Sequence, residues 1–210
     1  MKTILLSVLI AFTGFHLSAQ SQADAFIKEA QAFLAQKNYK QAQMSLQDAI
    51  NDLNNILATQ IAESLPIEIN GLKSTGDDNV NAAGMGMMGG GMTISKNYQH
   101  PTKMENTAEL LILANSPMMA TINMYMTNPA MLGQGYKSVR VGTRRAILKN
   151  EMEDYTDDKG VSKQIRSSEL QIPLTQTLIT INMKGFATEA DELAFANKLD
   201  IEKIKTALGE

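Results

Sequence analysis

Hydrophobic residues recur at helical spacing along two consecutive runs in the first third of the chain. The first run spans Ala25 to Leu34 and the second spans Tyr39 to Ile61, with Lys37-Asn38 breaking the pattern between them. Pro66 ends the second run, because proline disfavours a helical conformation in the residue before it. Residues 20–65 are therefore predicted to form a helical hairpin with one apolar stripe on each arm.

From residue 66 onward the hydrophobic period changes to two, which predicts β-strands. The segments predicted as strands are Ile67 to Leu72, Met92 to Tyr98, Ala108 to Ala114, Met119 to Met126, Val161 to Ile172 and Leu178 to Met183. Tyr136 to Glu151 is predicted to form one or two strands interrupted at Gly142, with Ala146 to Tyr155 as the first arm of a long hairpin. Turn sequences such as Asp157-Asp158-Lys159-Gly160 connect consecutive strands. A mostly antiparallel sheet of about five to seven strands is therefore expected.

A capped amphipathic helix is predicted at the end of the chain. Thr188 is the expected N-cap, with Glu189 and Asp191 in the first turn, where carboxylates interact favourably with the helix dipole. Asp200 is expected to cap a last turn. The predicted fold class is α+β, in which the C-terminal helix packs on the sheet of a domain spanning residues 66–210.

The first residues of the chain predict export. Met1-Lys2 supplies a positive charge, and Ile4 to Phe15 is an almost unbroken apolar run of 12 residues, too short to span a bilayer. Residues 1–19 are predicted to be a signal peptide cleaved after Ala19, with cleavage after Ala23 or an uncleaved anchor as the alternatives. The segment resembles the signal peptides of exported Bacteroidota proteins, which implies a periplasmic or secreted location. No second run reaches transmembrane length.

Small and aromatic residues in the hairpin follow the spacing of a known repeat. They are Ala30, Phe33, Tyr39, Ala42, Leu46 and Ala49, around the sequence KNYKQAQMSLQDAI. This stretch resembles one tetratricopeptide repeat of about 34 residues. The sequence contains no second copy, and stacked repeats need neighbours to bury their faces. The other interpretation is an ordinary helical hairpin that packs on the sheet or on another chain.

Charge and cysteine usage exclude several functions. Removal of Lys2 leaves 18 basic and 22 acidic side chains, and basic residues cluster only at Arg140, Arg144 and Arg145. Nucleic-acid binding needs a basic footprint and is not expected. The three arginines are expected to lie against acidic residues of the next strand, although they can also form a guanidinium cluster for a carboxylate or phosphate. Absence of cysteine excludes disulfides, thiol catalysis and thiolate metal sites.

The residues available for catalysis are few. His16 lies in the predicted signal peptide, which leaves His100, and no Gly-x-Ser-x-Gly elbow accompanies it. Acidic residues gather around one predicted turn: Glu151, Glu153, Asp154, Asp157 and Asp158. A glycosidase needs two carboxyl groups in a cleft, but such a cluster is more typical of a solvated hairpin end. No enzymatic activity and no cofactor are expected.

A methionine- and glycine-rich tract, GMGMMGGG, lies at residues 84–91. Met85, Met87, Met88 and Met92 place four thioethers close together in the sequence, and soft thioether sulfur selects Cu(I). The other interpretation is a mobile glycine-rich loop over residues 76–91. The sequence thus favours an exported, non-enzymatic binding protein that binds a partner or a second copy through its hairpin, with Cu(I) binding as the alternative.

Overall fold

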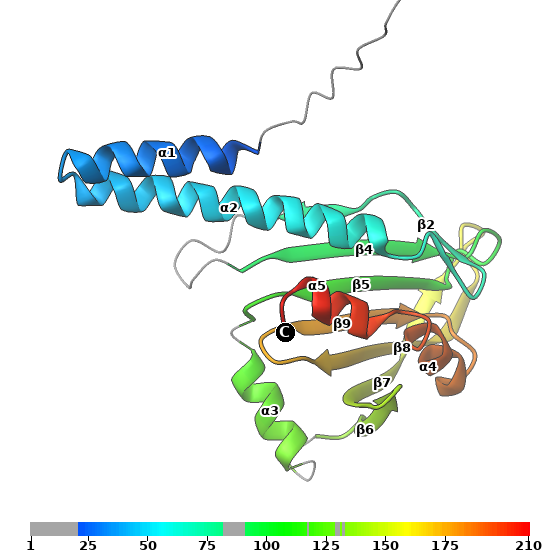
Figure 1. Ribbon diagram of the computed structural model, residues 1–210. Coiled ribbons are helices and arrows are strands. Elements are labelled where there is room, and N and C mark those ends of the chain that lie inside the picture. The colour runs from blue at the N-terminus through cyan, green and yellow to red at the C-terminus, as the bar shows by residue number, and fades with distance from the viewer. Residues whose placement is uncertain (1–20, 82–90, 117, 129–130, 132) are drawn as a thin grey trace, which may run out of the picture. The chain divides into compact units, whose positions relative to one another are not determined.

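Figure 1 shows a computed structural model of the chain, which describes residues 21–81, 91–116, 118–128, 131 and 133–210. The chain forms two compact units, Met1–Ala49 and Ile50–Glu210, which divide within its second helix. The predicted signal peptide and residues 82–90 of the predicted mobile loop lie outside the described residues. The first unit contains α1 (Gln22–Ala35) and the first turns of α2 (Tyr39–Ser64), which confirms the helical hairpin.

In the residues that the structure describes, the second unit is built on a sheet of nine strands. The strands are β1 (Glu68–Ile69), β2 (Leu72–Ser74), β3 (Asn79–Asn81), β4 (Thr93–Gln99), β5 (Thr107–Leu113), β6 (Tyr136–Val141), β7 (Arg144–Thr156), β8 (Ser162–Pro173) and β9 (Leu178–Lys184). Their order is β1-β2-β4-β5-β9-β8-β7-β6, with β3 paired to β4, and every pairing is antiparallel. The predicted α+β class is confirmed, whereas the expected five to seven strands were too few.

The additional strands are short and lie at one edge of the sheet. The single strand predicted over Ile67 to Leu72 is instead the hairpin of β1 and β2. Asn70 and Gly71 connect the two strands with positive φ angles of 50° and 84°, the conformation of a tight two-residue hairpin turn. Strand β3 falls within the predicted mobile loop and pairs with β4. Strands of two or three residues are too short to establish a hydrophobic period.

The prediction of a strand over Met119 to Met126 is wrong, because this segment forms helix α3 (Met119–Thr127). Its buried side chains, Met119 and Ile122, are three residues apart and lie against Ile147 of β7 and Leu178 of β9. Every second residue of the segment is apolar, but so are residues three to four apart. The sequence therefore fits both periods, and packing against the sheet selects the helix.

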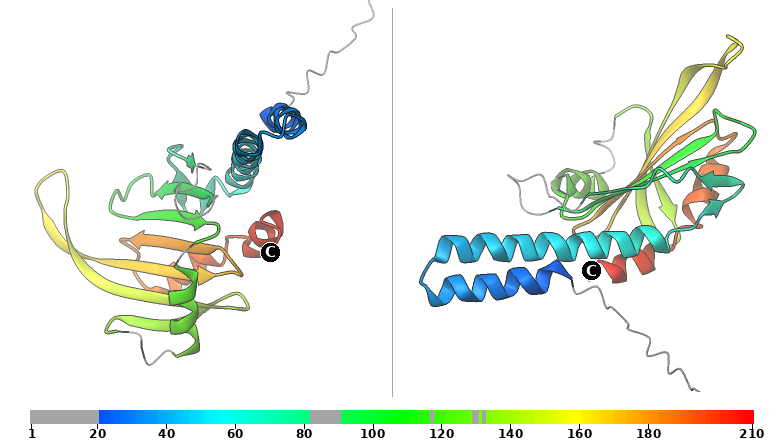
Figure 2. Two further views of the ribbon diagram at one scale, coloured as in Figure 1. Left: turned by 90° about the vertical axis from the view of Figure 1, so that its left-hand side faces the viewer. Right: turned by 90° about the horizontal axis from the view of Figure 1, so that it is seen from above.

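The main core lies between the opposite face of the sheet and three helices. Helices α4 (Glu189–Ala196) and α5 (Ile201–Ala207) contribute, and the second unit's part of α2 adds Ala58, Ile61 and Ala62. Figure 2 shows α3 and α5 on opposite sides of the sheet. Inward-facing strand residues at 0% exposure fill this core: Ile94, Leu110, Ile112, Ala146, Leu148, Leu170, Ile172, Ile179, Ile181 and Met183. The predicted docking of the C-terminal helical segment on the sheet follows from this apolar face.

Helix α4 begins as predicted at Thr188. The Thr188 hydroxyl accepts from the Asp191 N–H at 3.2 Å, and the Asp191 carboxylate accepts from the Thr188 N–H at 3.0 Å, forming a capping box. The predicted last turn is the separate helix α5, whose N-cap Asp200 accepts from the Lys203 N–H at 2.9 Å. Within the described residues, no helix is long and apolar enough to cross a membrane.

Candidate interaction surface

A tight turn reverses the chain between α1 and α2. Lys37 has a left-handed backbone with φ of 58°, and the Asn38 N–H donates to the Phe33 carbonyl at 2.9 Å. The Lys37 N–H donates to the Leu34 carbonyl at 3.0 Å, which completes a Schellman motif. The Asn38 side chain then accepts from the Gln41 N–H at 3.4 Å at the start of α2. The break predicted at Lys37-Asn38 therefore caps both helices and makes them antiparallel neighbours (Figure 1).

Small side chains form the interior of this hairpin. Its buried residues are Ala23, Ala30, Ala42, Ser45 and Ala49, none more than 4% exposed. Written as heptads abcdefg, the four alanines take the a positions, and Phe26, Phe33 and Ser45 take the d positions. Small residues at a let two helices approach closely, but they bury little apolar area.

Phe26 and Phe33 at d are half-buried, and four of the five exposed large apolar residues of the hairpin occupy e positions, with Met44 at c as the fifth. The four residues at e, which we name the apolar flank, are Ile27 at 38% exposure, Leu34 at 48%, Tyr39 at 67% and Leu46 at 44%. In an antiparallel pair of helices, the e positions of both helices lie on the same side of the a and d seam. The four side chains therefore share one side of the hairpin, and α2 continues the spacing at Leu53.

The other side of the hairpin is polar. The g positions there are Glu29, Gln36, Gln41 and Asp48, all exposed. The Ser45 hydroxyl donates to Glu29 Oε2 at 3.0 Å, which joins the interior of the hairpin to this polar flank. The hairpin thus presents one apolar flank and one polar flank, and only the first gains from being covered by a partner.

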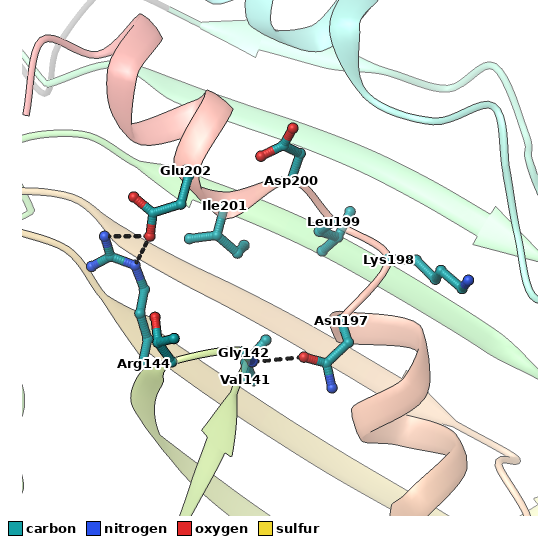
Figure 3. Close-up of a pocket in the computed structure, with 10 residues that line it drawn as sticks. Val141, Gly142, Arg144, Asn197, Lys198, Leu199, Asp200, Ile201 and Glu202 are labelled. Atoms are coloured by element: carbon teal, nitrogen blue, oxygen red, sulfur yellow. Dashed lines mark hydrogen bonds and ion pairs between the residues drawn. The ribbon is translucent and has the colours of Figure 1, made fainter.

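In the second unit, a hollow of about 460 Å³ lies between the β6–β7 turn and the α4–α5 corner (Figure 3). Arg144 donates to Glu202 Oε1 through Nε at 2.8 Å and Nη2 at 2.7 Å, and the Gly142 N–H donates to Asn197 Oδ1 at 2.7 Å. Asp200 caps α5, and Lys198 extends away from the hollow in Figure 3. These contacts fasten the turn to the helices and indicate a structural role.

The arginine alignment expected from the sequence is wrong. Arg144 pairs with Glu202 of α5 rather than with the next strand. Arg140 and Arg145 stand directly opposite each other across β6 and β7. The Arg140 guanidinium donates to the Thr143 carbonyl at 3.2 Å. The register of this short hairpin, which is set by its turn at Gly142, places the two arginines together.

Beyond the apolar cluster that α3 covers, the face of the sheet opposite the main core carries polar side chains on β5, β7, β8 and β9. Two hollows of about 340 and 410 Å³ adjoin there, and both are lined by Glu109, Asn182 and Lys184. The Lys184 ammonium lies 2.7 Å from Glu153 Oε1, and Asn182 donates to Glu109 at 3.0 Å. The hydrogen bond from Lys184 holds the pKa of Glu153 below its usual value. General acid catalysis by a glycosidase needs a raised carboxyl pKa, so this shift favours a solvated ion pair.

The predicted acidic turn is likewise a structural element. Asp157 accepts from the Lys159 N–H at 2.9 Å and the Val161 N–H at 2.8 Å, which closes the β7–β8 turn. Asp154 accepts from the Gln164 side chain across the same hairpin. Two of the five carboxylates, Asp154 and Asp157, therefore bind backbone and amide groups of their own hairpin.

The thioether candidates do not form a described site. Met85, Met87 and Met88 lie outside the described residues, and Met92 is 4% exposed within the main core. In the described part of the chain, no group of three or more His, Cys, Asp or Glu side chains is placed to hold a metal ion. Cu(I) binding therefore stays a prediction from the sequence.

His100 organises its own loop. Its ring atom Nδ1 accepts from the N–H groups of Thr102 and Lys103, each at 3.2 Å. The side chain thus holds the turn that leads from β4 towards β5.

The sequence shows the apolar stripes of the hairpin but not which of their residues remain exposed. The missed signal is a four-residue offset: Ile27 follows Ala23, Leu34 follows Ala30 and Leu46 follows Ala42. Alanine at every a position with a larger apolar residue at e indicates two adjoining seams rather than one broad stripe.

Comparison with known proteins gives little guidance. No protein-family model matches the chain, and no curated protein matches it. It is similar to a crystal structure from Bacteroides thetaiotaomicron VPI-5482 at 1.50 Å resolution, with a TM-score of 0.38 and 11% sequence identity. That similarity covers 61% of this chain and 43% of the other, and it bears on neither fold nor function.

Proposed function

We propose that this chain is a non-enzymatic binding protein and that the apolar flank of its hairpin binds another protein. The exposure of Ile27, Leu34, Tyr39 and Leu46, from 38% to 67%, carries the proposal. Single exposed apolar residues are ordinary on a protein surface, but an aligned group of four is typical of an interaction site. Because the interior of the hairpin consists mainly of alanines, the flank holds most of its exposed apolar surface.

Features of the second unit support binding rather than catalysis. The lysines of its polar face are paired with carboxylates, as Lys149 is with Glu151 at 2.9 Å and Lys184 is with Glu153 at 2.7 Å. His100 holds a turn through Nδ1. These groups stabilise the unit, which serves as a folded body attached to the binding hairpin.

We further infer that residues 1–19 direct export, so that the protein works in the periplasm or outside the cell. Intact-mass measurement on protein from the envelope fraction tests this inference. The expected mass is that of a chain beginning at Gln20, and a mass that retains Met1 to Ala19 would contradict it.

Site-specific photo-crosslinking in cells tests the binding function. A photoreactive residue is placed at Leu46 on the apolar flank or at Gln41 on the polar flank of the same helix. Both positions are exposed, so neither substitution disturbs a packed interior. We expect a discrete protein adduct from Leu46 and none from Gln41, because only the apolar flank excludes water on binding.

A second substitution shows whether the adduct depends on the whole flank. Leu34→Glu in α1, combined with the photoreactive residue at Leu46 in α2, should abolish the adduct, because it places a charge on the shared surface. The absence of any adduct at Leu46, or equal adducts at Leu46 and Gln41, would refute the proposed function.

A further inference from the structure

We propose that the partner of the apolar flank is a second copy of this chain and that two hairpins pack flank to flank as a four-helix bundle. This inference rests on the proposed function and names its partner. Helices with apolar residues at a and d alone suit a two-stranded coiled coil, whereas apolar residues at a, d and e suit a helix that faces a bundle core. Helix α1 has the second pattern, and α2 shares its apolar a and e positions but carries Ser45 at d.

The heptad positions explain why the hairpin alone is incomplete. Its a positions hold alanines that are 1% to 3% exposed, and its d positions include Ser45. The larger apolar side chains at e have no layer to pack against within the hairpin, where they remain 38% to 67% exposed. A second hairpin laid across the flank supplies that layer and turns the e positions into the centre of a bundle.

Electrostatics do not oppose the pairing of identical hairpins. Residues 22–49 contain three acidic and three basic side chains, which gives the hairpin zero net charge in a chain whose net charge is −3. Two copies therefore meet without net repulsion between their hairpins, and a net charge near zero promotes association. The b positions that border the flank at its middle are Gln31 and Gln43, uncharged side chains suited to an interface rim.

The exposed area fits a small dimer interface. At exposures of 38% to 67%, the four side chains present on the order of 400 Å² of largely apolar surface, the size of functional patches on monomers. Because interface cores are roughly 65% apolar, this patch with its polar rim corresponds to about 600 Å² per partner, near the lower end of stable interfaces. A dimer with a dissociation constant in the micromolar range is expected.

The polar flank limits the assembly to two copies. A solenoid of stacked hairpins needs an apolar surface on both sides of each hairpin. Here the opposite side carries Glu29, Gln41 and Asp48 at g, with Glu29 bonded to Ser45. With one apolar flank per chain, a two-fold contact uses the same surface on both copies and closes the assembly.

Sedimentation of the purified chain that begins at Gln20 tests the inference. We expect a monomer–dimer equilibrium in the micromolar range that Leu46→Glu weakens at least about 30-fold, because an unpaired charge enters the interface. Met44→Glu is the matched control: Met44 is 52% exposed on the same helix but lies at a c position away from the flank. It should leave the equilibrium unchanged, and circular dichroism should show equal helix content in both variants.

The absence of natural cysteine allows a second measurement. Leu34→Cys and Leu46→Cys, each alone or mixed with the other, should yield disulfide-linked dimers under mild oxidation faster than Met44→Cys does. A monomer at high micromolar concentration, or equal crosslinking from all three positions, would overturn the second-copy inference. If a cellular adduct from Leu46 persists with a mass other than twice that of the chain, the binding function stands with a different partner. If no adduct forms either, both proposals fail.

Discussion

The carboxylate of Glu192 is fully buried and depends on an ion pair with Arg166. Its side chain is 0% exposed, and it accepts from Arg166 Nε at 2.6 Å, Arg166 Nη2 at 3.1 Å and the Ser168 hydroxyl. Removing one partner of a buried ion pair leaves the other without compensation for its lost hydration. This carboxylate therefore ties α4 to β8 through hydrogen bonds from a charged and a neutral donor.

We predict that Glu192→Ala lowers the free energy of unfolding by about 2–4 kcal/mol, somewhat less than for a fully buried pair, because the Arg166 side chain is 24% exposed. Glu202→Ala is the control: it breaks the Arg144–Glu202 pair, whose carboxylate is 64% exposed, and should cost at most about 1 kcal/mol. Urea denaturation measures both values, and equal losses would contradict the distinction.

Glu210 predicts a pH dependence of stability. Burial raises the pKa of its carboxyl, but hydrogen bonds from Thr177, Gln176 and Thr175 outweigh this effect and lower the pKa below its ordinary value of 4.5. A carboxyl with a lower pKa in the folded state stabilises the fold above its unfolded pKa, and this contribution is lost as pH falls through the folded pKa. Wild-type protein should therefore lose stability on acidification below about pH 4.5.

Glu210→Gln replaces the carboxyl with an amide that does not titrate. Its free energy of unfolding should already be lower at pH 7, and its further loss between pH 5 and pH 3 should be smaller than that of the wild type. Chemical denaturation at several pH values gives both slopes. Parallel slopes would show that the hydrogen bonds to the β8–β9 turn are not linked to protonation of this group.

At the scale of elements, the turn that leads from β9 into α4 depends on one glycine. Gly185 has φ of +70°, and an added Cβ would lie 2.5 Å from the Glu105 carbonyl oxygen. Gly185→Ala should cost about 2–4 kcal/mol, since left-handed strain adds to a clash with backbone. Gly160 has a similar φ of +78° with nothing within 4 Å of a Cβ, so Gly160→Ala should cost only about 1–2 kcal/mol. Thermal unfolding compares the two, and equal shifts would show that crowding adds nothing.

Elements with long, consistent patterns were predictable from the sequence, and ambiguous ones were not. The long β7–β8 hairpin follows from the alternation of its two strands. The Thr188 cap follows from a hydroxyl side chain placed before a turn rich in carboxylates. Met119 to Thr127 satisfies both helical and strand periods, so only its packing on Ile147 and Leu178 decides the outcome. The contact of Arg144 with Glu202 joins residues 58 apart in the sequence, and no local pattern encodes it.

At the scale of the whole molecule, the two compact units bury very different side chains. The hairpin buries mainly alanines, whereas the sheet unit buries Leu110, Ile112, Ile179 and Ile181 at 0% exposure. Because burial stabilises by roughly 0.8 kcal/mol per methylene, local opening of the hairpin should cost much less free energy than opening of the sheet.

Hydrogen exchange of the full chain tests this difference. At submicromolar concentration, amides of residues 22–49 should exchange at least about tenfold faster than those of β5 and β9. Protection of the hairpin should rise with protein concentration if a second copy covers its flank. Equal protection of both regions at high dilution would show that the alanine seam is as stable as the core of the sheet.

The candidate surface could be predicted only in part, because it depends on how the two helices of the hairpin pack together. The stripes of α1 and α2 were visible in the sequence, but a stripe does not show which of its residues face the neighbouring helix. The close approach at Ala23, Ala30, Ala42 and Ala49 settles that question and leaves Leu34 and Leu46 outside. Exposure is therefore a property of the pair of helices rather than of either helix alone.

The two borders of the sheet determine how readily the protein aggregates by adding strands from other molecules. A free strand edge is a template for fibril growth, because its unpaired backbone groups recruit strands from other molecules. In the described residues, one border consists of β1 and β3, which are two and three residues long. The other consists of β6, which carries Lys137 and Arg140, and of the part of β7 beyond Lys149, which carries Glu151, Glu153 and Asp154. Neither offers a long, uncharged template, so runaway strand addition is disfavoured. If two hairpins pair as proposed, concentrating this protein favours reversible contacts between helices over amyloid-like growth of its sheet.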